Sequence, residues 1–126
     1  MTMDTDHPEQ LDFRKRTFDF AVRIVRMVRA LPSDSVSREL GKQVLRSGTS
    51  VGANARSAKR GRSAAEFAAK MGIVEEECDE TMFWIELLIA TETIPEERAK
   101  ALLAEAEEIL RITVASIKTS RRNQHG

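Results

Sequence analysis

Apolar residues recur at intervals of three and four through most of the chain, and no stretch alternates strictly between apolar and polar positions. The clearest run begins after Ser63 and extends to about Thr91. Its apolar positions are Phe67, Met71, Val74, Cys78, Met82, Ile85 and Leu88. Ser63 and Glu66 have the spacing of a capping box. The pattern therefore predicts a helix about 40 Å long.

Three further segments show the same helical period, over about residues 12–30, 33–58 and 93–120. Ser33 or Ser35 is expected to cap the second of them, and the last is expected to open at Thr93, with Pro95 near its first turn. Four amphipathic helices with short connections predict an all-α fold, an antiparallel up-and-down four-helix bundle.

The chain has 126 residues, which is enough for one domain with its own core. We expect a single bundle domain over residues 12–120, with flexible tails at 1–11 and 121–126. A single cysteine, Cys78, and the lack of a long apolar run or signal-peptide pattern favour a cytoplasmic protein with no membrane segment.

The second segment contains small residues between Ser47 and Ala53, and its Gly48 and Gly52 each lower helix propensity by about 1 kcal/mol relative to Ala. This run is expected to let another helix approach closely. Apolar residues also remain outside the main helical stripes. They are Phe18, Val22, Val25, Ile73, Phe83, Trp84, Leu87, Ile112 and Val114. Either the stripes are wide, or a second apolar surface is covered by other copies of the chain. We favour self-association, with Phe83, Trp84 and Leu87 as the candidate interface.

Charges are sorted along the chain although the formal net charge is zero. Residues 14–62 contain thirteen Lys and Arg against three acids, and residues 63–112 contain four bases against thirteen acids. A hairpin turning at Gly61 would place residues equidistant from that glycine opposite each other. It predicts three structural ion pairs, namely Arg56 with Glu66, Arg46 with Glu76 and Lys42 with Glu80.

We find no catalytic constellation in the sequence, and expect no enzyme activity, cofactor or metal. The acidic run at residues 75–80 raises the possibility of a carboxylate metal site of the kind found in helical bundles. However, the only histidines, His7 and His125, lie in the expected tails. Cys78 is a poor candidate nucleophile, because the surrounding acids would raise its pKa.

A basic surface gives a second functional hypothesis. The candidate nucleic-acid-binding residues are Arg16, Arg23, Arg26 and Arg29 in the first helix and Arg56, Lys59, Arg60 and Arg62 near the Gly61 turn. Such clusters attract phosphate backbones without reading sequence. The alternative is a solvated charged face, which is common on helices.

Residues 45–88, LRSGTSVGANARSAKRGRSAAEFAAKMGIVEEECDETMFWIELL, resemble the core signature of the bacterial four-helix bundle proteins, also called intervening-sequence proteins. The similarity is close over about 40–90 and extends over 13–120. The resemblance implies a left-handed antiparallel bundle that assembles as a ring-like homopentamer in the cytoplasm, with no known enzyme activity. A related accessory protein of diversity-generating retroelements is a basic pentamer that binds nucleic acid and a reverse transcriptase.

Several positions match the family pattern, none with a catalytic role: Gly52, Asn54, Arg62, Ser63, Glu66, Phe67, Glu76, Asp79, Glu80, Trp84 and Glu86. At the position after Asn54 the family usually has a bulky residue, whereas this chain has Ala55. Lys59 and Arg60 make the turn at Gly61 more basic than in many relatives. The sequence thus predicts a non-catalytic scaffold or adaptor that self-assembles, with a pentamer as the implied state. The alternative is a module that binds RNA or DNA without sequence specificity, and another protein is a further possible partner.

Overall fold

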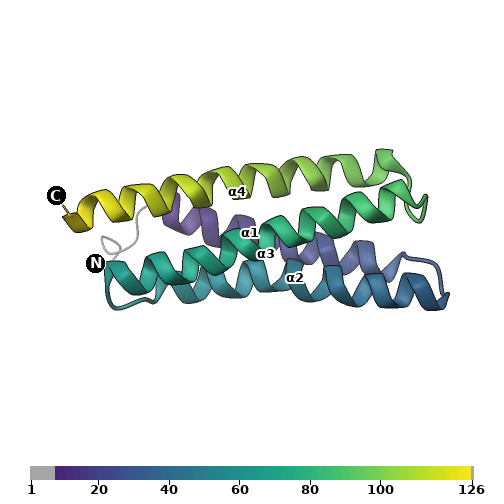
Figure 1. Ribbon diagram of the computed structural model, residues 1–126, viewed down its shortest axis with the longest axis horizontal. Helices are drawn as coiled ribbons and strands as arrows, with labels where there is room; N and C mark the ends of the chain where they lie inside the picture. Colours follow the sequence, from purple (N-terminus) through teal and green to yellow (C-terminus); the bar gives the residue numbers. More distant parts are fainter. Residues whose placement is uncertain (1–7, 126) are drawn as a thin grey trace.

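A computed structural model of the chain describes residues 8–125, with side chains from 12 to 123. It contains four helices, α1 (Pro8–Arg29), α2 (Ser35–Lys59), α3 (Ala64–Ala90) and α4 (Glu96–His125). Figure 1 shows them side by side, with successive helices running in opposite directions. No strand occurs in the part of the chain that the structure describes. The prediction of an all-α, antiparallel four-helix bundle is confirmed.

The outer helices extend further than the sequence pattern indicated. Helix α1 begins at Pro8, a residue well suited to a first helical turn because its missing N–H would have no partner there. Helix α4 continues to His125. Parts of both expected tails are therefore helical. Residues 1–7, which include His7, and residue 126 lie outside the described residues.

Helix α2 is capped by Asp34 and not by Ser33 or Ser35 as predicted. The Asp34 carboxylate accepts hydrogen bonds from the Ser37 backbone N–H and from the Ser37 hydroxyl, each at 2.9 Å. These bonds lower the pKa of Asp34. A carboxylate satisfies two donors at once and also interacts favourably with the helix dipole, which explains why it replaces a serine as the cap.

Helix α3 begins as predicted, with Ser63 as its N-cap. The Ser63 hydroxyl accepts a hydrogen bond from the Glu66 N–H at 3.1 Å. The Glu66 carboxylate accepts a hydrogen bond from the backbone N–H of Arg62 at 2.7 Å. In a standard capping box the donor would be the N-cap residue, here Ser63, so the bond lies one residue earlier.

The connection between α3 and α4 is longer than predicted, so that α4 begins at Glu96 and not at Thr93. Glu92 adopts a left-handed backbone conformation with φ of 59°. The Thr93 N–H then donates to the Leu88 carbonyl at 2.9 Å, which closes the end of α3. Ile94 folds into the core, where only 7% of its surface is exposed.

The core lies between the four helices and is continuous along the bundle. Helix α2 packs against α1 and α3, and α3 packs against α2 and α4, whereas α1 and α4 approach each other at few positions. The largest fully buried apolar side chains are Phe20, Ile24, Met71, Ile85, Leu88, Ile109, Val44, Val51 and Val74. Val36, in the first turn of α2, is 63% exposed.

The small residues of α2 allow α1 to approach closely, as predicted. A Cβ atom at Gly48 would lie 2.7 Å from Cγ1 and 2.8 Å from Cγ2 of Ile24. A Cβ atom at Gly52 would lie 3.1 Å from the backbone oxygen of Thr17. Both glycines therefore lower the helix propensity of α2 but allow α1 to pack closely against it.

Two glycine substitutions test this reading. We expect Gly48→Ala to destabilise the chain by about 1–3 kcal/mol despite the better helix propensity of alanine, because Ile24 is fully buried and cannot move aside. Gly72→Ala is the matched control. No atom lies within 4 Å of the Cβ position there, and we expect a gain of about 0.5–1 kcal/mol. Urea unfolding measures both, and stabilisation by Gly48→Ala would contradict the close approach.

Candidate functional site

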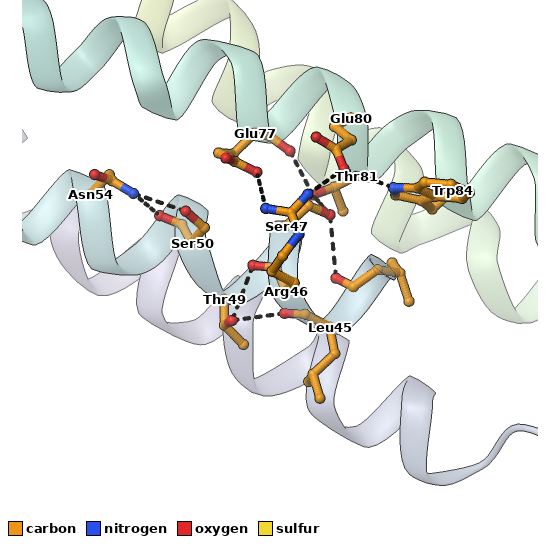
Figure 2. A network of polar contacts seen from close by, with 11 residues as sticks. Leu45, Arg46, Ser47, Thr49, Ser50, Asn54, Glu77, Glu80, Thr81 and Trp84 are labelled. Carbon is orange, nitrogen blue, oxygen red and sulfur yellow. Dashed lines mark hydrogen bonds and ion pairs between the residues drawn. The ribbon is translucent and has the colours of Figure 1, made fainter. Parts of the chain in front are cut away.

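The basic limb (residues 14–62) and the acidic limb (residues 63–112) meet where α2 lies against α3, at a network centred on Arg46. Figure 2 shows the guanidinium of Arg46 between two carboxylates of α3. Its Nη1 lies 3.2 Å from Oε1 of Glu77, and its Nη2 bonds Oε2 of Glu80. The predicted partner, Glu76, instead faces outward and is exposed. The fold-back of the two limbs is thus present, but the pairing of Arg46 with Glu76 was wrong.

A buried hydrogen bond lies beside this network. The Thr81 hydroxyl is 2.8 Å from the Ser47 hydroxyl, and both side chains are fully buried. Helical side chains lean toward the N-terminus of their own helix. A side chain of α2 therefore leans away from the turn, and a side chain of α3 leans toward it. Contacts between them consequently involve α3 residues further from the turn than equal spacing about Gly61 predicts.

The other two predicted ion pairs are also wrong. Lys42 bonds Glu39 of its own helix at 3.3 Å and not Glu80. Between residues 12 and 123, no ion pair joins Arg56 and Glu66. The carboxylate of Glu66 is engaged by the backbone of Arg62 instead. The same shift in register accounts for Lys42, since Glu80 has moved to the level of Arg46.

The three residues of the candidate interface differ in how far they are exposed. They are Phe83, Trp84 and Leu87. Trp84 is half-buried against the core, and its indole N–H donates to Oε2 of Glu80 at 3.1 Å. This bond and the Arg46 guanidinium lower the pKa of Glu80. Leu87 is half-buried. Phe83 is 55% exposed, with its ring edge-on to that of Trp84 at a centroid distance of 5.0 Å.

We call the outward face of α3 around Phe83 the acidic ridge. Its members are Glu76, Asp79, Phe83 and Glu86, all exposed. Their spacing of three and four residues places them on one face of the helix. Within the described residues none of these three carboxylates forms an ion pair. The ridge therefore combines an exposed aromatic ring with unpaired negative charge.

An open hollow lies between α1 and α2, with a volume of about 660 Å³. We call it the basic hollow. It is lined by Arg14, Lys15, Phe18, Ala21, Thr49, Gly52, Ala53 and Arg56. Phe18 is 60% exposed at its edge. Of the three cations, Lys15 pairs with Asp19 at 2.9 Å, whereas Arg14 and Arg56 form no ion pair in the part of the chain with described side chains.

The candidate nucleic-acid-binding residues do not form one surface. Arg16 makes two hydrogen bonds to Glu105 of α4, from Nε at 2.6 Å and from Nη2 at 2.9 Å, and so joins two neighbouring helices that otherwise approach each other at few positions. Arg23 and Arg26 line a second hollow between α1 and α4 together with Arg98. Arg29 is exposed at the last turn of α1.

The remaining candidates lie at the opposite end of the bundle. This end, which we call the basic end, is formed by the α2–α3 turn and the last turns of α4 (Figure 1). A hydrogen bond of 3.4 Å joins the Ser120 hydroxyl to the Ala64 carbonyl there. Its cations are Arg56, Lys59, Arg60 and Arg62, and also Lys118, Arg121 and Arg122. The sequence analysis did not include these α4 cations among its candidates, and it placed Arg121 and Arg122 in a tail.

Neither Cys78 nor the acidic run at residues 75–80 has the surroundings of a reactive or metal-binding group. The Cys78 thiol is fully buried and donates to the Ala106 carbonyl at 3.1 Å. Burial raises its pKa to about 12, with smaller contributions from the charges of Asp79 and Glu105. The predicted direction is correct, but burial is the larger cause. No group of three or more potential metal ligands occurs among the described residues, and none of their helices is long and apolar enough to span a membrane.

Comparisons with known proteins complete this picture. A sequence model described as 23S rRNA-intervening sequence protein matches residues 9–115. A crystal structure of a protein of unknown function from the S23 ribosomal protein family, from Bacteroides thetaiotaomicron, shares 39% sequence identity with this chain and superimposes with a TM-score of 0.80. The match covers 84% of this chain and 98% of that chain. No curated protein matches.

Proposed function

Since the chain belongs to the 23S rRNA-intervening sequence protein family, we propose that it is a non-catalytic scaffold or adaptor that self-assembles in the cytoplasm as a pentamer. The observation that carries this proposal is the exposure of two phenylalanine rings, Phe18 and Phe83, on different helices of a small bundle. Exposed aromatic rings beside unpaired charges are typical of interface cores and their rims.

The rest of the surface is consistent with this role. The apolar residues left over from the helical stripes are half-buried along α1, α3 and α4, which leaves Phe18 and Phe83 as the prominent exposed rings. Phe18 lies in a hollow lined by Arg14 and Arg56, and Phe83 lies on one helix face with Asp79 and Glu86. A monomer gains nothing from holding these rings in water, whereas an assembly would bury them.

A second candidate function is binding of RNA or DNA at the basic end. The convergence of the α2–α3 turn with the last turns of α4 favours it, because seven cations from distant parts of the sequence share this end. The basic end is a better candidate than the face of α1 that we expected from the sequence, because Arg16 on that face is paired with Glu105. Phosphate attraction by such a cluster would be independent of base sequence.

Sedimentation equilibrium of the purified chain tests self-assembly. We expect a single species with five times the chain mass of 14.2 kDa at micromolar concentration and physiological salt. A different closed oligomer would contradict the pentamer alone. A chain that remains single at millimolar concentration would contradict the scaffold proposal as a whole.

Fluorescence anisotropy with a labelled single-stranded RNA, titrated at several salt concentrations, tests the second candidate. We expect Arg60→Ala with Arg62→Ala to lower the slope of log affinity against log salt by about 1–2, because two phosphate contacts are lost. Arg26→Ala with Arg29→Ala at the other end is the matched control and should leave the slope unchanged. Equal effects of the two double variants, or no binding by the wild type at low salt, would refute an interface at the basic end.

A further inference from the structure

The two exposed phenylalanines lie on different helices and have different electrostatic surroundings. Figure 1 shows α1, which carries Phe18, on the far side and α3, which carries Phe83, on the near side. Arg14 and Arg56 line the basic hollow beside Phe18. Asp79 and Glu86 flank Phe83 at four residues before it and three residues after it. The chain therefore carries two surfaces, each with an exposed aromatic ring, whose charges complement each other.

The basic hollow has the form of a receptor for an aromatic ring. Ala21, Gly52 and Ala53 line it with little or no side chain, and this absence leaves the space open beside Phe18. Arg14 has its Nε atom buried without a hydrogen-bond acceptor. A buried donor without a partner is costly. The Arg14 side chain also lines the hollow and forms no ion pair among the described side chains, so a carboxylate of an incoming chain would meet an unpaired positive charge there.

The acidic ridge has the form of a matching knob. The ring of Phe83 meets that of Trp84 edge-on, at an angle of 73° between their planes. Trp84 is in turn fixed by its hydrogen bond to Glu80, which Arg46 also holds. Phe83 is thus supported by residues that are already ordered in the single chain. A rigid aromatic knob loses little conformational entropy when it is buried in a partner.

We propose that Phe83 of one copy inserts into the basic hollow of a second copy, with Asp79 and Glu86 placed against Arg14 and Arg56. This interface rests on the proposed self-assembly and specifies its surfaces. Pairing either surface with itself would oppose like charges, which excludes a two-fold arrangement of ridge on ridge or hollow on hollow. Each copy that uses its ridge still offers a hollow, so assembly proceeds head to tail until a ring closes.

Two variants block the two surfaces separately. Phe83→Ala removes the knob, and Ala53→Glu places a bulky acid in the hollow; both positions are exposed on helices, and both new residues are good helix formers. We expect each variant alone to associate at least about 30-fold more weakly than the wild type. An equimolar mixture should form a dimer of one copy of each and nothing larger, since one intact ridge meets one intact hollow. Val36→Ala, which removes another exposed apolar residue at the start of α2, is the matched control and should assemble as the wild type does.

Sedimentation velocity separates the outcomes, with circular dichroism melting expected to match the wild type for all three variants. Wild-type assembly by Phe83→Ala or Ala53→Glu alone would overturn this interface while leaving self-assembly intact. Absence of the mixed dimer from two folded variants would also overturn it. A wild-type chain that stays single would overturn the interface and the proposed self-assembly together.

Discussion

The pairing of α2 with α3 is the constraint on which the rest of the molecule depends. It brings the basic and acidic limbs together through Arg46, which bonds Glu77 and Glu80, and through the buried contact between Ser47 and Thr81. Exposed ion pairs contribute only about 0–1 kcal/mol each. The charges therefore act less as a source of stability than as a means of fixing how far α3 slides along α2.

This register decides which charges remain available at the surface. When Glu77 and Glu80 turn toward α2, the helical period directs Glu76, Asp79 and Glu86 outward, together with Phe83. The same helix that neutralises the basic limb thus presents an unpaired acidic face. On the other side of the molecule, Gly48 and Gly52 draw α1 close to α2, and the small residues beside that contact leave the basic hollow open. The two proposed interaction surfaces follow from how the core is packed.

Much of the fold could be predicted because it is local in origin. The intervals of three and four apolar residues predicted four helices, the spacing of Ser63 and Glu66 predicted the start of α3, and the small residues of α2 predicted a close helix contact. The errors arose where the outcome depends on geometry that no short pattern contains. Asp34 displaced two serines as a cap because it could satisfy two donors of Ser37. Glu92 adopted a left-handed conformation that is more usual for glycine, and so delayed the start of α4.

The interaction surfaces were predicted less well, and for a physical reason. Whether a cation is available depends on what a distant helix places next to it, as Arg16 shows by bonding Glu105 across 89 positions of sequence. The cations of α4 join the basic end only because four helices bring the end of the chain back to the α2–α3 turn. Pairing by equal distance from Gly61 failed because it ignored the lean of helical side chains.

The register of α2 against α3 can be measured directly with a double-mutant cycle at Ser47 and Thr81. Ser47→Ala and Thr81→Val should each destabilise the chain, because each removes the hydrogen bond between these two buried hydroxyls. We expect the double variant to cost about 1 kcal/mol less than the two single costs added together. Additive costs would mean that the two hydroxyls do not meet, and that α2 and α3 pair in a different register from the one described.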